Sequence, residues 1–89
     1  MKVKISKRFV KDTQKITDQR ILAKIRQIII DANSVESLSE LANLTEMSGY
    51  IHFYRIKFDY RYRIGIYFDG EVVEFLRVGN REDFYKKFP

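Results

Sequence analysis

Large apolar and basic residues alternate along residues 54–67, and this alternation constrains the fold of the chain more than any other feature. In the first part of the stretch the apolar side chains share one parity, while Arg55 and Lys57 share the other. The pattern resumes after the polar residues 59–61, where Arg63 again has the opposite parity from its apolar neighbours. Strict alternation is typical of a strand with two different faces. The stretch therefore predicts a β-hairpin with a short turn.

One face of this hairpin gathers the cations Arg55, Lys57 and Arg63. Burying cations in a core without a counter-charge is prohibitively costly. We therefore expect this face to meet solvent or an anion, and the rest of the sequence has to indicate which anion.

The composition limits the choice of ligand. The chain of 89 residues is expected to form one domain spanning 1–89. It has no cysteine and a single histidine, which excludes thiolate and histidine-rich metal sites, and we expect no cofactor. Neither a membrane-spanning run nor a signal peptide is present, so the expectation is a soluble, cytoplasmic protein without a membrane partner. A net charge of +5 suits a polyanion or an acidic protein partner.

The first half of the chain predicts one strand and two helices. Residues 2–5 alternate and predict a short strand, after which Ser6 is a favourable N-cap for a helix over 7–15. Asp18 is a favourable N-cap for a second helix, whose apolar residues recur at spacings of three and four over 21–29. The short joint between them predicts an αα-hairpin.

The second half predicts an antiparallel meander. Residues 34–49 favour either a short helix or a turn-rich crossover. After the hairpin, Asp69-Gly70 predicts a two-residue type I′ turn. The strand over 71–78 is apolar on both parities and is therefore expected to be central, and residues 80–89 form at most two helical turns. The fold class is α+β, with an N-terminal strand, a two-helix hairpin and a three-strand antiparallel meander.

Basic residues interleaved with tyrosines are the candidate functional feature. Basic groups bind phosphate, and aromatic rings stack on unpaired nucleobases. The alternative is an ordinary solvated sheet face, on which long basic side chains cover apolar surface. Arg77 and Arg81 add two cations from the neighbouring strand, which favours anion binding. The single histidine, His52, has no catalytic partner in the sequence, and Asp12 is interpreted with the other helical aspartates as a cap or a solubilising residue.

Three motifs in this order resemble the RelE/ParE superfamily of toxins from toxin–antitoxin systems, and the RelE branch fits best. The motifs are Tyr54-Arg55-Ile56-Lys57, Tyr62-Arg63-Ile64-Gly65-Ile66 and Arg77-Val78-Gly79-Asn80-Arg81-Glu82-Asp83-Phe84-Tyr85. The resemblance covers nearly the whole chain and implies the RelE-like microbial ribonuclease type of fold. It also implies a metal-independent endoribonuclease that enters the ribosomal A site, cleaves mRNA there and inhibits translation.

The implied reaction is a transesterification in which the 2′-hydroxyl attacks the adjacent phosphorus. Such a reaction needs a base for the hydroxyl, cations for the developing charge and a proton for the leaving oxygen. By resemblance, Arg63 would stabilise the phosphorane-like state, and Arg81 would contact the leaving oxygen as a proton donor. Tyr85 would act as the base or stack on a nucleobase. Arg55 and Lys57 would hold RNA phosphates.

The sequence departs from the family pattern at two places. Asn80 stands where many relatives have histidine or lysine before the motif arginine. Asparagine neither carries a charge nor accepts a proton usefully, so the expectation is a weaker activity or one that uses Tyr85 alone. The hairpin turn 59–61 lacks glycine, which leaves the register open by one residue, so Arg61 is an alternative to Arg63 and a further phosphate-binding candidate.

The resemblance leaves two other functions open. One is a ParE-like toxin that poisons DNA gyrase by binding, and the other is a degenerate member that binds only an antitoxin or operator DNA. In every case the resemblance implies a small antitoxin whose acidic segment neutralises the cationic face. Operator DNA would be bound only through the complex with that antitoxin.

Overall fold

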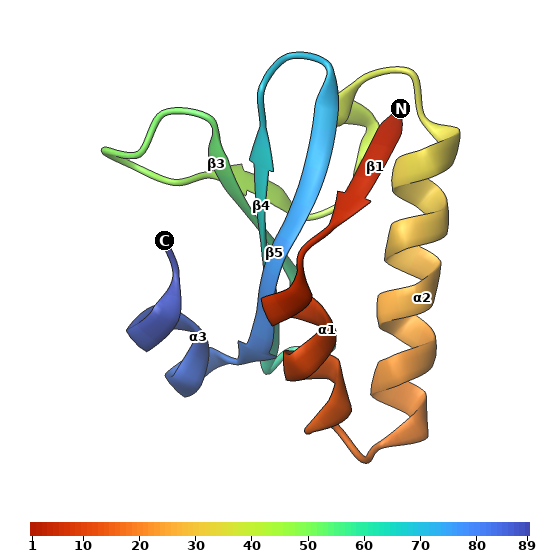
Figure 1. Cartoon of the computed structure of the whole chain (residues 1–89), viewed down its shortest axis with the longest axis vertical. Coiled ribbons are helices and arrows are strands. Elements are labelled where there is room, and N and C mark those ends of the chain that lie inside the picture. The colour runs from red at the N-terminus through yellow and green to blue at the C-terminus, as the bar shows by residue number, and fades with distance from the viewer.

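The computed structural model describes residues 1–89 and contains three α-helices and five strands (Figure 1). The elements are β1 (Lys2–Ile5), α1 (Lys7–Gln14), α2 (Gln19–Ser34), a 3₁₀ helix (Leu38–Glu40), β2 (Leu44–Glu46), β3 (Phe53–Phe58), β4 (Tyr62–Phe68), β5 (Val72–Asn80) and α3 (Arg81–Lys87). The strands form one sheet in the order β1-β5-β4-β3-β2. Strand β1 pairs in parallel with β5, and the other pairs are antiparallel. None of the helices combines the length and the apolar character needed to cross a membrane.

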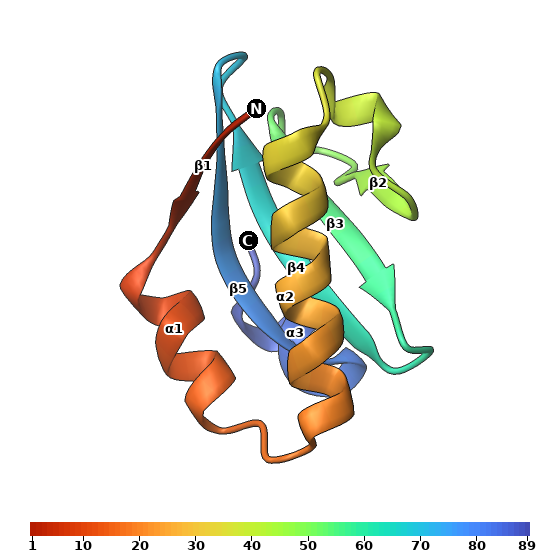
Figure 2. The ribbon, with the colours of Figure 1, turned by 90° about the vertical axis from the view of Figure 1, so that its right-hand side faces the viewer.

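The α+β class, the N-terminal strand, the two-helix hairpin and the meander are all confirmed. Both predicted N-caps are present: the Ser6 side chain accepts from the amide of Phe9, and the Asp18 side chain accepts from the amide of Arg20. The two helices splay apart from their short joint, and α1 packs on β5 (Figure 2). Each helix therefore buries its apolar face mainly against the sheet.

Two details of the sheet differ from expectation. Strand β2 was not predicted, since its three residues are too few to show an alternation. The prediction of a two-residue type I′ turn at Asp69-Gly70 is wrong. Three residues join β4 to β5, and only Gly70 among them has a positive φ, of 99°. The Asp69 carboxylate instead accepts from the amides of Glu71 and Val72, each at 2.8 Å.

The main core lies between the inner face of the sheet and the helices α1 and α2. It includes Phe9, Ile21, Ile25, Ile56, Ile64, Ile66, Val73, Phe75 and Val78. The opposite face of β4 is covered by α3 and by Phe88 directly after this helix, whose ring lies over Gly65. A Cβ atom at Gly65 would come within 2.6 Å of that ring. Glycine at this position therefore permits α3 to pack directly on the sheet.

Candidate functional site

Three arginines converge on one pocket of about 320 Å³ where the β3–β4 turn meets the start of α3. We call it the arginine pocket, and its lining residues are Tyr60, Arg61, Arg63, Asn80, Arg81 and Glu82. The backbone brings two of these residues together, because the amide of Arg81 donates to the carbonyl of Arg61 at 2.6 Å. Residues far apart in the sequence thus share one cationic cavity with a single carboxylate side chain in its lining.

Arg63 is the buried member of the pocket, with only 7% of its surface exposed. Its Nη1 donates to the carbonyl oxygens of Tyr60, at 3.4 Å, and Tyr62, at 3.0 Å, while its Nε is buried without a partner. Of the two expected surroundings of this cationic face, solvent or an anion, open solvent is excluded for Arg63. The Arg63 side chain is buried, and no carboxylate forms an ion pair with its guanidinium group. A buried charge without a counter-ion favours an anionic ligand in the pocket.

Arg55 and Tyr85 form a second cluster beside the first. The Nη1 of Arg55 donates to the Tyr85 hydroxyl at 2.7 Å, and its guanidinium carbon lies 5.7 Å from the centre of the tyrosine ring. Arg55 Nε is buried and has no hydrogen-bond partner. The structure therefore joins these two candidate residues to each other, although neither lines the arginine pocket.

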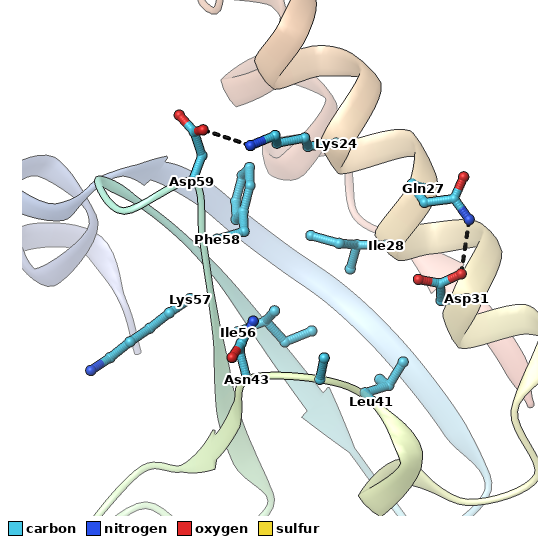
Figure 3. Close-up of a pocket in the computed structure, with 11 residues that line it drawn as sticks. Lys24, Gln27, Ile28, Asp31, Leu41, Asn43, Ile56, Lys57, Phe58 and Asp59 are labelled. Atoms are coloured by element: carbon cyan, nitrogen blue, oxygen red, sulfur yellow. Dashed lines mark hydrogen bonds and ion pairs between the residues drawn. The ribbon is translucent and has the colours of Figure 1, made fainter.

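Lys57 links the two clusters along the sheet. It is exposed, and its Cα is paired with that of Arg63 across β3 and β4. Its side chain points away from α2, on the side of β3 opposite Phe58 (Figure 3). It lines a shallow neighbouring pocket together with Arg63. All six candidate residues thus lie on the turn, the outer sheet face or α3.

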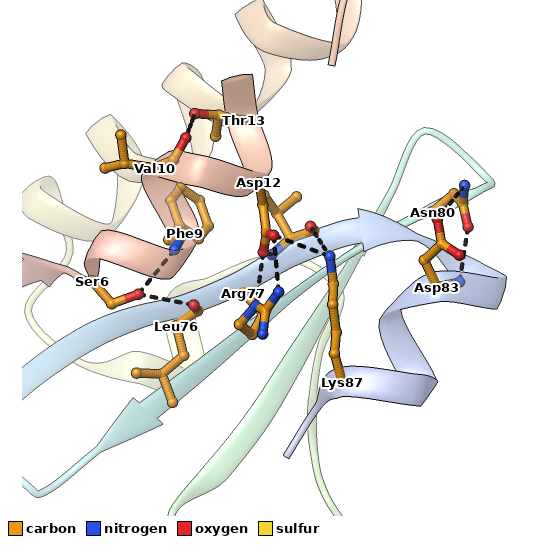
Figure 4. Close-up of polar contacts among 11 residues, drawn as sticks. Ser6, Phe9, Val10, Asp12, Thr13, Leu76, Arg77, Asn80, Asp83 and Lys87 are labelled. Carbon is orange, nitrogen blue, oxygen red and sulfur yellow. Dashed lines mark hydrogen bonds and ion pairs between the residues drawn. The ribbon is translucent and has the colours of Figure 1, made fainter. Parts of the chain in front are cut away.

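Arg77 does not belong to this cationic set, so counting it among the cations that favour anion binding at this face is wrong. Its guanidinium donates to both carboxylate oxygens of Asp12, at 2.9 and 3.0 Å (Figure 4). Asp12 is only 4% exposed, which also overturns its interpretation as a helix cap or a solubilising residue. The same carboxylate accepts from the amide of Val78 at 3.0 Å and pairs with Lys87 Nζ at 3.2 Å. Asp12 therefore joins α1, β5 and α3.

The electrostatics of Asp12 favour its ionised form. Burial raises the pKa of this carboxyl group, but hydrogen bonds from Arg77, Val78 and Lys87 lower it by more. The net result is a pKa below the ordinary value of 3.8. Asp12 is therefore a charged anchor at neutral pH.

Asn80 has a structural role at the junction between β5 and α3. It is the N-cap of α3, and its Oδ1 accepts from the amide of Asp83 at 3.0 Å (Figure 4). Asparagine is among the best N-caps, whereas lysine offers no acceptor. This departure from the family pattern thus fixes the start of the helix that carries Arg81 and Tyr85. His52 precedes β3, at the strand end opposite the pocket.

Sequence reasoning missed two residues that shape the site, Asp12 and Tyr60. The position of Asp12 three residues after the buried Phe9 places both on one helical face, and this was an available signal. Tyr60 stands in a turn without glycine, and its backbone has a φ of 62°. Its side chain is 95% exposed beside the arginine pocket.

The chemistry available to the pocket is that of cations and hydroxyl groups. Guanidinium groups bind phosphate oxygens in pairs through their planar fork of donors. No group of three or more His, Cys, Asp and Glu side chains lies close enough together to hold a metal ion. The site is suited to binding an anion and to stabilising charge that develops on it.

Comparison with known proteins identifies relatives that match this chain over nearly its whole length. No protein-family model matches the chain. Toxin RelE3 of Methanocaldococcus jannaschii is 37% identical over 90 residues, and the match covers all of both chains. The structure of a RelB–RelE antitoxin–toxin complex from Methanococcus jannaschii matches with a TM-score of 0.83 and 32% identity, over 97% of this chain and 99% of that one. A RelBE2 toxin–antitoxin complex from Mycobacterium tuberculosis matches with a TM-score of 0.70 and 23% identity, over 90% and 96% of the chains, which supports the fold alone.

The full-length match to Toxin RelE3, together with the shared fold, places the chain in the class of toxins from toxin–antitoxin systems. Within this class, the chain belongs to the RelE family.

Proposed function

We propose that this protein is a ribosome-dependent endoribonuclease that cleaves mRNA in the A site and thereby inhibits translation. The observation that carries the proposal is the convergence of Arg61, Arg63 and Arg81 on one pocket. A buried guanidinium group without a counter-ion, such as that of Arg63, costs folding free energy unless an anion binds to it. A phosphate of the RNA backbone supplies that anion.

In the proposed reaction the 2′-hydroxyl oxygen attacks the adjacent phosphorus, and the bond from phosphorus to the 5′ oxygen breaks. Tyr85 acts as the base that takes the hydroxyl proton, and the neighbouring Arg55 donates a hydrogen bond to its hydroxyl oxygen at 2.7 Å. Arg63 stabilises the charge on the phosphorane-like state. Arg81 acts as the proton donor to the leaving 5′ oxygen, which departs as a hydroxyl group. Lys57 and Arg61 hold the flanking phosphates, and no metal ion takes part.

Cleavage in a translating extract tests the proposal directly. Wild-type protein, Arg81→Ala and Tyr85→Phe are added with and without ribosomes, and the cut positions in a reporter mRNA are mapped by primer extension. We expect cuts only with ribosomes, and a loss of about 100-fold or more in rate for each variant, as is typical when one proton-transfer group is removed. Lys86→Ala is the matched control, because Lys86 is an exposed cation on α3 outside the pocket.

Three outcomes would contradict the proposal in different ways. Growth arrest with intact mRNA and damaged DNA would favour poisoning of gyrase. Neither cleavage nor arrest would indicate a member that only binds its partner. Wild-type rates in both Arg81→Ala and Tyr85→Phe would leave the activity in place but overturn the assignment of the site.

An antitoxin is the second partner in this proposal. The RelE structures to which this chain is similar are complexes with an antitoxin. The chain carries a net charge of +5, and three cations without an ion pair, Arg61, Arg63 and Arg81, line the arginine pocket. An acidic antitoxin segment would neutralise this surface and block RNA from it. Operator DNA would be bound through that complex only.

A further inference from the structure

The β3–β4 turn holds an aromatic residue in a conformation that aromatic residues rarely adopt. Asp59 and Tyr60 are consecutive and have φ values of 45° and 62°. Glycine and asparagine tolerate this left-handed region, whereas a bulky side chain is disfavoured there. The amide of Arg61 donates to the carbonyl of Asp59, which closes a tight turn with Tyr60 at its centre.

Three contacts hold this turn in place from different directions. The Asp59 carboxylate accepts from Lys24 on α2 at 2.7 Å (Figure 3). It also accepts from Arg20 on the same helix at 2.7 Å. The Tyr60 carbonyl accepts from the buried Arg63 at 3.4 Å. On the third side, the carbonyl of Arg61 at the end of the turn accepts a hydrogen bond from the amide of Arg81, the first residue of α3. Such strained residues persist where the surroundings over-determine them, and they cluster at functional sites.

The ring of Tyr60 itself takes no part in holding the turn. The residue is 95% exposed, and its ring makes no aromatic contact and its hydroxyl no hydrogen bond. At the same time Tyr60 lines both the arginine pocket and the shallow pocket beside it. The turn thus presents a free aromatic face next to the cationic arginine pocket.

We propose that Tyr60 is a stacking platform for an unpaired nucleobase of the RNA strand whose phosphate occupies the arginine pocket. Aromatic rings that flank a cationic groove bind single strands in this manner, and stacking accepts any base because every base has a π-face. The inference rests on the proposed function for the identity of the ligand as RNA. It adds a base-binding residue that contacts the strand beyond the reacting phosphate.

The absence of tryptophan from the chain provides a specific probe. Tyr60→Trp introduces one fluorophore at the platform, and stacking on a base quenches its emission. The purified full-length variant is titrated with a single-stranded 2′-O-methyl RNA of mixed sequence, which cannot be cleaved, and with inorganic polyphosphate as a ligand without bases. We expect quenching by RNA and none by polyphosphate.

Tyr50→Trp is the matched control, because Tyr50 is 52% exposed and lies beyond the opposite end of β3. At about 3.3 Å per residue, the strand separates the two positions by roughly 20 Å. Its tryptophan is expected to keep its emission when RNA binds. Circular dichroism verifies that both variants fold.

A second measurement separates the ring from the backbone. Tyr60→Asn keeps a residue that tolerates the left-handed turn but removes the ring, whereas Tyr60→Phe keeps the ring. By anisotropy of labelled RNA, we expect Tyr60→Asn to lower affinity roughly 5- to 160-fold, the range for one base–aromatic stack, and Tyr60→Phe to bind like wild type.

The proposal is overturned if the introduced tryptophan keeps its emission while anisotropy shows bound RNA, if Tyr60→Asn binds as tightly as wild type, or if wild type binds no RNA. Loss of antitoxin binding in Tyr60→Asn with unchanged RNA affinity would assign the ring to a protein interface and also overturn it. These measurements need neither ribosomes nor cleavage. Failure of the nuclease proposal is therefore distinguishable from failure of the stacking proposal.

Discussion

The ammonium group of Lys87 lies 3.2 Å from the Oδ1 atom of Asp12, which ties the end of α3 to a buried carboxylate on α1. Lys87 also donates to the carbonyl of Val78 at 3.1 Å. Because Arg81 and Tyr85 lie on the same short helix, this anchor fixes the position of two proposed catalytic residues.

Removal of the anchor is expected to lower both stability and activity. Asp12→Ala leaves Arg77 and Lys87 without their counter-ion, which should cost about 3 kcal/mol of unfolding free energy. Lys87→Met removes only the link to α3 and should cost about 1–2 kcal/mol. Urea denaturation measures both values. Lys86→Met, at an exposed position, is the control and should change stability very little.

The same carboxylate predicts an acid-dependent loss of stability. The folded pKa of Asp12 lies below its ordinary value of 3.8, so its contribution is complete above that pH and disappears as the pH falls through the folded pKa. Asp59 also has a lowered pKa, through hydrogen bonds from Lys24 and Arg20, and it acts in the same direction. The difference in unfolding free energy between wild type and Asp12→Asn isolates the first contribution. It should shrink below pH 3.8, and a constant difference would contradict the assignment.

Gly65→Ala should displace the C-terminal segment. The added methyl group would lie 2.6 Å from the ring of Phe88, so the ring has to move away from the sheet. Overpacking of this kind costs about 1–3 kcal/mol. In a double-mutant cycle measured by urea denaturation, Phe88→Leu should recover part of that loss by making room. Additive effects of the two substitutions would exclude direct contact as the cause.

Relief of the strained turn should stabilise the protein at the expense of RNA binding. Tyr60→Asn replaces an aromatic residue at a φ of 62° with one that tolerates the left-handed region, and a gain of about 1 kcal/mol is expected. Thermal and urea denaturation measure the gain. Tyr50→Asn is the control, since the backbone of Tyr50 has a negative φ and offers no strain to relieve.

Local patterns in the sequence predicted the elements well and their long-range contacts poorly. Alternation identified β3, β4 and the central position of β5, and hydrogen-bonding side chains identified the caps at Ser6 and Asp18. The ion pair of Asp12 with Arg77 joins residues separated by 65 positions, and no periodicity reports such a contact. Two consecutive residues with a left-handed backbone were expected at Asp69-Gly70. They occur instead at Asp59 and Tyr60, where contacts from three elements hold the backbone in this conformation.

The candidate site was predictable to the extent that it follows the strands. The alternation placed Arg55, Lys57 and Arg63 on one sheet face, and the register of β3 and β4 agrees. The burial of Arg63 was not predictable, because it depends on how the β3–β4 turn and the start of α3 lie around this side chain. The convergence of Arg61 with Arg81 likewise depends on a backbone hydrogen bond between the turn and α3.

The carboxylate of Asp12 also closes an edge of the sheet. Strand β1 ends at Ile5, opposite Phe75, whereas β5 continues to Asn80, so the later part of β5 has no strand beside it on that side. An unpaired strand edge is a template on which another chain can add a strand and aggregate. Because Asp12 accepts from the amide of Val78, this position is already occupied from within the molecule. Loss of that carboxylate would therefore favour edge-to-edge association between copies at high concentration.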